Sequence, residues 1–281
     1  MGLGIYTKLK ELIHFAHKLK SEKNIQAVEI TKYESDLLFG KRALIVGGTG
    51  GIGFSIANAF INVGCKVVIT GTKQETLTYA LNKLPRGSSG LVLDLLNPNI
   101  FEKKIIEAQD LLAGEKIDIF VNAAGFHGNE PFGSVSEETY DRVLDINLKG
   151  MYFMVQAAGD YMKKNGVKGH ILNVSSAAAL KPAWTPYEIS KWGVRALTLG
   201  AADELIPYGI VVNAIAPGPV ATSMLSFKEG DTLYTDCVPT ERFATPKEIA
   251  QLAVVMASDL CNLVIGDTFY ITGGSGTIRY R

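Results

Sequence analysis

The stretch that decides the fold is Ala43-Leu44-Ile45-Val46-Gly47-Gly48-Thr49-Gly50-Gly51-Ile52-Gly53, in which an apolar run passes directly into a glycine-rich run. A continuous apolar run of this length predicts a strand that is buried on both faces, as in a parallel sheet covered by helices. The glycines allow a tight turn and the close approach of backbone to a pyrophosphate, whose charge a helix N-terminus stabilises. We therefore expect a strand, a dinucleotide-binding turn and a helix, in that order.

Short apolar runs alternate with longer helical patterns along the rest of the chain. Further strands are predicted at 67–70, 91–93, 117–121, 170–174, 210–213 and 268–271, and helices near 52–63, 74–84, 98–113, 136–164, 187–205 and 246–258. This alternation predicts an α/β fold of the Rossmann type, with a doubly wound parallel seven-stranded sheet in a three-layer α/β/α arrangement. We expect residues 41–281 to form a single domain.

Residues 1–40 have a different pattern. Ile5, Leu9, Leu12, Ile13, Ala16 and Leu19 recur at helical spacing among lysines, which predicts an N-terminal amphipathic helix over residues 4–22. Its apolar face is expected to be buried on the body of the protein or on a sister subunit. Contact with a membrane surface or a partner is the alternative.

Composition excludes several classes of protein. Lys plus Arg and Asp plus Glu both number 28, so the chain has no global attraction for nucleic acid or an anionic membrane. Cys65, Cys237 and Cys261 lack the spacing of metal ligands, so we predict no metal site, and their odd number suits reduced thiols in a cytoplasmic protein. No uninterrupted apolar stretch reaches about 18 residues, so no transmembrane segment is predicted.

The end of the second predicted strand bears on the choice between NAD and NADP. A carboxylate there would repel the 2′-phosphate of NADP, but the chain reads Thr70-Gly71-Thr72-Lys73, with hydroxyls and one cation. NADP is therefore the preferred cofactor and NAD the alternative. In the alternative, Lys73 simply opens the next helix, exposed to solvent.

Tyr187 and Lys191 stand four residues apart, so one helical turn places both side chains on the same face. A nearby ammonium stabilises a phenolate, and we expect it to lower the pKa of Tyr187 from its ordinary value near 10. Tyr187 would then serve as a general acid or base. Alone, such a pair is common on helix surfaces, so its interpretation depends on the neighbouring motifs.

These motifs, in this order, resemble the short-chain dehydrogenase/reductase family over residues 40–275. The glycine-rich turn, Asp94 after the third strand, Asn122-Ala123-Ala124-Gly125 and Pro217-Gly218-Pro219-Val220-Ala221-Thr222 are similar to the cofactor-binding segments of that family. The resemblance, together with the hydroxyls and the cation at the end of the second predicted strand, assigns the following residues to the cofactor: Gly47, Thr49, Gly50, Gly51, Ile52, Gly53, Thr70, Thr72, Lys73, Asp94, Leu95, Asn122, Ala123, Ala124, Gly125, Tyr187, Lys191, Pro217, Gly218, Val220 and Thr222.

The same resemblance implies a catalytic set of Asn147, Ser176, Tyr187 and Lys191. Ser176 and Tyr187 are expected to hydrogen-bond the substrate oxygen, Lys191 to hold the nicotinamide ribose, and Asn147 to position a water or close a helix irregularity. The gap from Ser176 to Tyr187 is shorter than in many family members, so Ser175 is the alternative to Ser176. Substrate contacts are expected from His127, Ser176, Trp184 and Met224.

The resemblance implies an oxidoreductase that acts on CH–OH groups with NAD(P). We expect an NADPH-dependent reductase of a small ketone or a 3-oxoacyl thioester, similar to 3-oxoacyl-(acyl-carrier-protein) reductases. The alternatives are an NAD-dependent dehydrogenase of a sugar, polyol or other secondary alcohol, and a non-catalytic nucleotide-binding protein of the same fold. The resemblance also implies a homo-oligomer, either a tetramer or a dimer, formed by the helices around 140–163 and 187–205.

Overall fold

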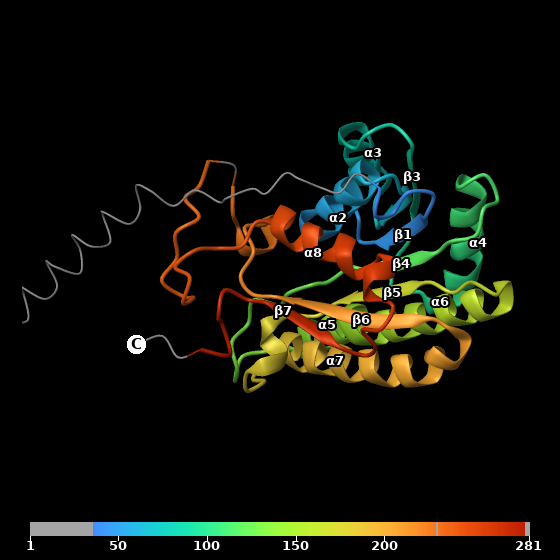
Figure 1. Cartoon of the computed structure of the whole chain (residues 1–281). Coiled ribbons are helices and arrows are strands. Elements are labelled where there is room, and N and C mark those ends of the chain that lie inside the picture. The colour runs from blue at the N-terminus through green and yellow to red at the C-terminus, as the bar shows by residue number, and fades with distance from the viewer. Residues whose placement is uncertain (1–35, 229, 279–281) are drawn as a thin grey trace, which may run out of the picture.

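The computed structural model describes residues 36–228 and 230–278, so the predicted N-terminal helix over residues 4–22 lies outside the described residues (Figure 1). Seven parallel strands form one sheet in the order β3-β2-β1-β4-β5-β6-β7. The strands are β1 (Arg42–Val46), β2 (Lys66–Gly71), β3 (Ser88–Val92), β4 (Ile119–Asn122), β5 (His170–Val174), β6 (Val211–Pro217) and β7 (Thr268–Ile271). The predicted Rossmann-type sheet is confirmed.

Helices cover both faces of the sheet, as Figure 1 shows. The longer ones are α2 (Gly51–Asn62), α3 (Gln74–Lys83), α4 (Phe101–Leu111), α5 (Glu137–Leu144), α6 (Met151–Asn165), α7 (Pro186–Leu205) and α8 (Pro246–Met256). Short helical turns are η1 (Pro98–Ile100), η2 (Asp145–Gly150), η3 (Ala177–Leu180), η4 (Ile206–Tyr208), η5 (Ser223–Leu225) and η6 (Asp259–Cys261). The sheet and the α-helices on its two faces form the predicted three-layer arrangement.

Two hydrophobic cores follow from the alternation of side chains along each strand. In β1, Ile45 packs with α2, α3 and α8 on one face of the sheet, while Leu44 and Val46 pack with α4, α6 and α7 on the other. Successive strand residues point to opposite faces, so a strand between two helical layers needs apolar residues at every position. The apolar run of β1 meets this requirement, and β1 lies inside the sheet between β2 and β4.

Several predicted boundaries differ from the structure, and two of these differences have a structural reason. The third strand begins at Ser88, three residues before the predicted start at Leu91. β3 is an edge strand that pairs only with β2, so its first residues can be small and polar. The long helix predicted at 136–164 is interrupted by the π-helical turn η2, which divides α5 from α6 and contains Asn147.

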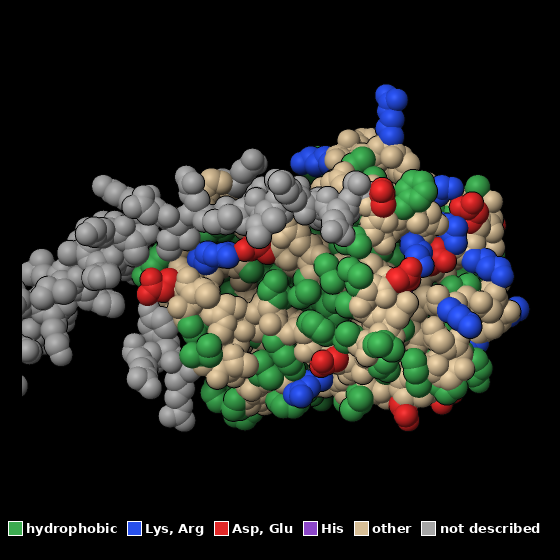
Figure 2. Space-filling model, viewed as in Figure 1, with side chains coloured by type: hydrophobic (Ala, Val, Ile, Leu, Met, Phe, Trp, Pro, Cys, Tyr) green, Lys and Arg blue, Asp and Glu red, His purple; other side chains and the backbone are tan. Residues whose placement is uncertain are grey.

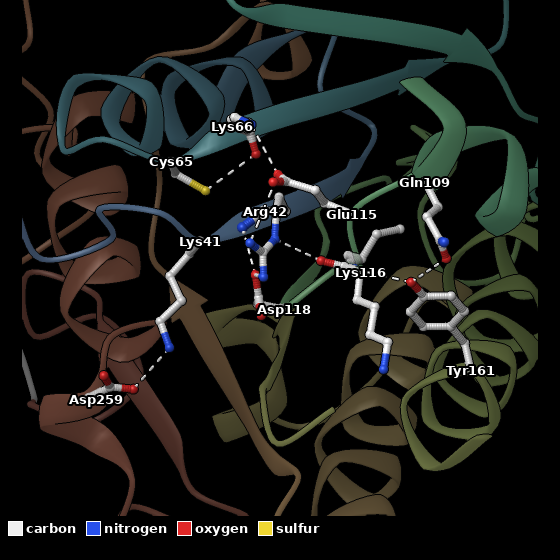
Figure 3. Close-up of polar contacts among 11 residues, drawn as sticks. Lys41, Arg42, Cys65, Lys66, Gln109, Glu115, Lys116, Asp118, Tyr161 and Asp259 are labelled. Atoms are coloured by element: carbon white, nitrogen blue, oxygen red, sulfur yellow. Dashed lines mark hydrogen bonds and ion pairs between the residues drawn. The ribbon is translucent and has the colours of Figure 1, made fainter. Parts of the chain in front are cut away.

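Polar side chains join the elements at the amino ends of the strands (Figure 3). Arg42 forms an ion pair with Asp118, with 2.7 Å between Nη2 and Oδ2, and Lys66 pairs with Glu115 at 2.9 Å. The Tyr161 hydroxyl accepts a hydrogen bond from the Ile117 backbone at 3.0 Å. These contacts fasten β1, β2 and the segment before β4, on the side of the sheet opposite the carboxyl ends of the strands.

Candidate active site

The glycine-rich turn joins the carboxyl end of β1 to the first turn of α2. Gly47 has a φ of +79°, and a Cβ at this position would lie 2.6 Å from the Ala124 backbone. Gly50 precedes the helix with an extended backbone and provides no side-chain cap for the first N–H groups of α2. An uncapped helix N-terminus has N–H donors and a positive dipole end that suit a phosphate anion.

A cavity of about 430 Å³ lies at this turn. Here β1 pairs with β2 on one side and with β4 on the other, so the chain reverses its direction across the sheet after β3. Such a reversal of strand order is where dinucleotides bind in doubly wound sheets. Thirteen of the residues assigned to the cofactor line this cavity: Gly47, Thr49, Gly50, Gly51, Ile52, Thr70, Thr72, Asp94, Leu95, Ala123, Ala124, Gly125 and Thr222. The residues present therefore fit a bound dinucleotide.

Three residues assigned to the cofactor do not line either this cavity or the adjoining one. A Cβ on Gly53 would collide with the Gly47 carbonyl, so this glycine permits the close approach of α2 to the turn. Lys73 is exposed and immediately precedes α3. Asn122 is buried, and its Nδ2 donates to Asn173 Oδ1 at 2.8 Å, which joins β4 to β5 beneath the site.

Arg142 lines the same cavity, although the sequence analysis did not single it out. It belongs to the last turn of α5, and its Cζ lies 4.7 Å from the centroid of the Phe126 ring. No other lysine or arginine of the described chain lines this cavity, and a cation there suits the phosphates of a dinucleotide. Nothing in the local sequence marks this position, because only the fold brings the end of α5 to the cavity.

A second cavity of about 460 Å³ continues from the first, because Ile52, Ala123, Ala124, Gly125, Thr222 and Met224 line both. It brings together Ser176, Tyr187 and Lys191 with Pro217, Gly218 and Val220 of the predicted nicotinamide loop. The capping box of Thr185 and Glu188 starts α7 two residues before Tyr187. Three of the four predicted catalytic side chains thus line the second cavity, which adjoins the first, and Asn147 lines neither.

Lys191 is fixed by its surroundings rather than by a carboxylate. Its Nζ donates to the Val174 carbonyl at 2.9 Å and lies 5.6 Å from the centroid of the Tyr187 ring. Burial penalises the charged ammonium and lowers the pKa of Lys191 to about 8. Lys191 therefore still carries a positive charge at neutral pH and loses it in mildly alkaline solution.

The pKa of Tyr187 differs from the sequence-based prediction. Burial raises the pKa of this phenol above its ordinary value, and the Ser176 hydroxyl only counteracts part of the effect by hydrogen bonding. The expected lowering of this pKa by the Lys191 ammonium was wrong, since desolvation of the phenolate is the largest cause of the shift. The His127 ring, 4.4 Å from the Tyr187 ring between centroids, contributes to this burial.

The two adjacent serines have different partners. Ser175 is buried, and its hydroxyl donates to the Lys191 carbonyl at 3.1 Å, which attaches β5 to α7. The Ser176 oxygen accepts from the Ala178 backbone at 3.1 Å and lies next to the Tyr187 hydroxyl. Of the two, Ser176 has the hydroxyl that accompanies Tyr187 in the cavity.

Asn147 occupies the π-helical turn η2 and is fully buried. Its Oδ1 accepts from the Phe126 N–H at 2.7 Å, and its Nδ2 donates to the Phe126 carbonyl at 2.8 Å. A Cβ on Gly125 would lie 3.6 Å from Asn147 Oδ1 and 3.7 Å from Lys191 Nζ, so both head groups meet at this glycine. The amide therefore fixes the Gly125–Phe126 backbone beside the ammonium.

The predicted substrate residues are only partly brought together. His127, Ser176 and Met224 line the second cavity. Trp184 does not, and its side chain is 66% exposed. Its backbone N–H donates to Glu188 Oε2 in the cap of α7, which directs this loop to the surface. In the described part of the chain, no group of three or more His, Cys, Asp or Glu side chains is arranged to hold a metal ion.

Comparisons with known proteins agree with this geometry. A family model described as enoyl-(acyl carrier protein) reductase matches residues 47–276. The chain is 32% identical to a 3-oxoacyl-(acyl-carrier-protein) reductase of Aquifex aeolicus, over 84% of this chain and 98% of that protein. It is 33% identical to a galactitol 2-dehydrogenase of Agrobacterium fabrum, over 85% and 98%. A solved structure described as a short chain dehydrogenase/reductase family protein superposes with a TM-score of 0.76 at 32% identity, over 85% and 98%.

Proposed function

The chain belongs to the short-chain dehydrogenase/reductase family, and on this premise we propose that it is an NADPH-dependent reductase of a ketone or a 3-oxoacyl thioester. Members of the family are oxidoreductases that act on CH–OH groups with a nicotinamide cofactor. The observation that carries the proposal is the second cavity, which adjoins the first and is lined by Ser176, Tyr187 and Lys191 together with the segment expected to hold nicotinamide. The cofactor, when bound, supplies the hydride.

The proposed roles follow from the charge that develops during reduction. Negative charge grows on the carbonyl oxygen, where the hydroxyls of Ser176 and Tyr187 donate hydrogen bonds and Tyr187 delivers the proton. The raised pKa of Tyr187 keeps the phenol protonated at neutral pH, which suits a proton donor and therefore the reducing direction. Lys191 holds the nicotinamide ribose, and Asn147 keeps the backbone beside the ammonium in place.

The preference for NADP rests on the end of β2. Thr49, Thr70 and Thr72 line the first cavity there, and Asp94, after β3, is the single carboxylate among its lining residues in the described chain. Hydroxyl donors without an adjacent carboxylate suit a 2′-phosphate. Lys73 follows directly and is free to approach a bound phosphate from the surface.

The substrate is proposed at the level of class. Similarity to a 3-oxoacyl-(acyl-carrier-protein) reductase favours an acyl thioester or a simple ketone. A sugar or polyol dehydrogenase is the second candidate, because His127, Asn129, Glu130 and Glu188 give part of the second cavity a polar lining that suits hydroxyl groups. The similarity to galactitol 2-dehydrogenase supports the same candidate.

The proposal is tested by assaying the purified protein with NADPH and NADH in parallel against ketones and acetoacetyl thioesters, following nicotinamide absorbance. The reverse reaction is assayed with polyols and NAD or NADP. We expect carbonyl reduction with a higher kcat/KM for NADPH than for NADH. Faster polyol oxidation with NAD would favour the second candidate, and no turnover with any pair would overturn the enzymatic proposal.

The remaining expectations about the whole protein are proposals as well. We propose that residues 1–40 extend a single catalytic domain of residues 41–281, with Leu38 packed in the core beside α2. A cytoplasmic location is supported by the three cysteines, all of them free. No helix of the described chain is long and apolar enough to cross a membrane.

A further inference from the structure

The second cavity is also lined by Lys181 and Ser275, which no step of the proposed reaction uses. We propose that these two residues form a subsite for an anionic group of the substrate, a carboxylate or a phosphate. The inference rests on the proposed function and narrows its substrate to carbonyl or alcohol compounds that carry such a group. It depends on how the chain brings these two residues together and on which charges surround them.

Three glycines bring Ser275 onto the cavity wall. Gly273, Gly274 and Gly276 have φ values of +61°, +87° and +84°, a region that residues with side chains rarely adopt. They fold the chain back after β7, so that a Cβ on Gly276 would lie 3.4 Å from Lys181 Cε. Ser275 is 5% exposed, so its hydroxyl is held in a protected position beside Lys181.

Lys181 is attached to the same short segment as Ser176. It follows η3, which begins directly after Ser176, and its carbonyl accepts a hydrogen bond from Trp192 Nε1 at 2.9 Å. Its Nζ donates to Ser275 Oγ at 3.0 Å. Because the ammonium has three N–H donors and the serine oxygen accepts one of them, two N–H groups and the serine O–H are left to donate to an anion.

The positive charge of Lys181 is not neutralised by an ion pair with any carboxylate of residues 36–228 and 230–278. Glu130 and Glu188 also line the cavity, but their oxygens accept hydrogen bonds from neighbouring groups. Glu130 accepts from the Ser136 backbone at 2.8 Å, and Glu188 from the Thr185 backbone at 2.9 Å. Both carboxylates keep their negative charge but point their oxygens at these donors, and Lys181 is the one cation besides Lys191 that lines this cavity in the described chain.

The spacing along η3 limits the size of the substrate. A 3₁₀-helix rises about 2 Å per residue, so the four residues of η3 separate Ser176 from Lys181 by roughly 10 Å between Cα atoms. Side chains reach into the cavity from both ends of this interval. The subsite therefore suits a compound in which a few bonds separate the reacting carbonyl from the anionic group.

Matched substrates test the inference. We expect 5-oxohexanoate to be reduced with a higher kcat/KM than its methyl ester, and dihydroxyacetone phosphate with a higher value than dihydroxyacetone. The first pair tests recognition of a carboxylate and the second tests recognition of a phosphate, so the two results show which anion the subsite prefers. Loss of one charge-assisted contact in Lys181→Met should lower the preference for the anionic member by about tenfold to a hundredfold. Ser275→Ala should lower it less, and Lys103→Met, which removes an exposed lysine of α4, should leave it unchanged.

Binding separates failure of this inference from failure of the proposed function. Calorimetric titration of the NADP-loaded protein with the same four compounds should give tighter binding of the anionic members, reduced in Lys181→Met. If the anionic compounds bind more tightly but none of the four compounds is turned over, the subsite is supported and the proposed activity is overturned. If the wild type turns over these compounds and Lys181→Met keeps its preference, or if neither anion binds more tightly than its neutral partner, the subsite is overturned.

Discussion

Burial acts on Tyr187 and Lys191 in opposite directions. It raises the pKa of the phenol and lowers that of the ammonium to about 8, because each charged form loses its water. The raised pKa keeps Tyr187 a neutral phenol at neutral pH, and the lowered pKa of Lys191 still lies above 7, so most of the lysine stays protonated there. This is the protonation state that a reductase requires, with the proton on Tyr187 available for the product alcohol.

The alkaline limb of the pH profile should report Lys191. The ammonium predominates below pH 8 and is lost as the pH rises through about 8, so kcat/KM for NADPH should be level near neutrality. Above pH 8, kcat/KM should fall by up to tenfold per pH unit, since the neutral amine no longer attracts the cofactor. Tyr187 titrates higher, above its ordinary value of 10. Initial rates between pH 6 and 10 measure this, and a level profile to pH 10 contradicts it.

Candidate catalytic side chains could be named from the sequence, but their environment could not. Tyr187, Lys191, Ser176 and Asn147 follow one another in a recognisable order, and they converge in the fold. The pKa of Tyr187 depends on burial by neighbours such as His127, which lies 60 positions away in the chain. Arg142 was missed for the same reason, because nothing local indicates that the end of α5 borders the cavity.

At the scale of elements, the position of Tyr187 depends on the N-terminus of α7. Thr185 accepts a hydrogen bond from the Glu188 backbone at 3.4 Å, and Glu188 Oε2 accepts from the Thr185 N–H at 2.9 Å. The same box recurs at the start of α8, where Thr245 and Glu248 have equivalent contacts at 3.3 and 2.8 Å. The two caps form a matched pair, one beside the catalytic residues and one remote from them.

Thr185→Ala and Thr245→Ala should therefore separate stability from activity. Each substitution removes one N-cap and should lower the free energy of unfolding by about 1 kcal/mol. Only Thr185→Ala should also lower kcat, by roughly threefold to tenfold, because Tyr187 lies in the first turn of the affected helix. Denaturant unfolding and steady-state rates measure both effects. Equal losses of kcat in the two variants would contradict the proposed role of the α7 cap.

Most elements could be predicted because their apolar residues repeat with the period of a strand or a helix. The turn η2 was not placed by periodicity, since an extra residue in a π-helical turn leaves the apolar pattern on either side nearly continuous. The start of β3 was missed because an edge strand can form from Ser88, Ser89 and Gly90 without apolar side chains. The first residues of β3 form a strand because they pair with β2, and their local sequence does not encode this pairing.

At the scale of the whole molecule, apolar side chains remain exposed on α6 and α7. Tyr152 is 49% exposed and Leu199 is 63% exposed, and both helices border a groove of about 520 Å³. Figure 2 shows positive and negative side chains interspersed with hydrophobic ones on the face displayed, in keeping with equal numbers of acids and bases. Such a surface suits association of copies of the chain rather than binding of nucleic acid.

We therefore expect a homo-oligomer formed through α6 and α7. Leu199→Arg should shift the expected dimer or tetramer toward smaller species, because it places a charge in the proposed apolar interface. Ile106→Arg on α4, also at a half-exposed helical position, is the control and should keep the wild-type mass. Sedimentation equilibrium measures the assembly. A wild-type monomer, or an unchanged mass in Leu199→Arg, would contradict the expectation.

The central claim is that Tyr187, beside Lys191, delivers a proton during carbonyl reduction. The most direct measurement compares Tyr187→Phe with the wild type for NADPH oxidation by a reducible ketone, together with NADPH binding by fluorescence. Loss of a general acid should lower kcat by about a hundredfold to ten-thousandfold, while NADPH affinity changes little. A Tyr187→Phe variant that reduces the ketone at the wild-type rate would contradict the account.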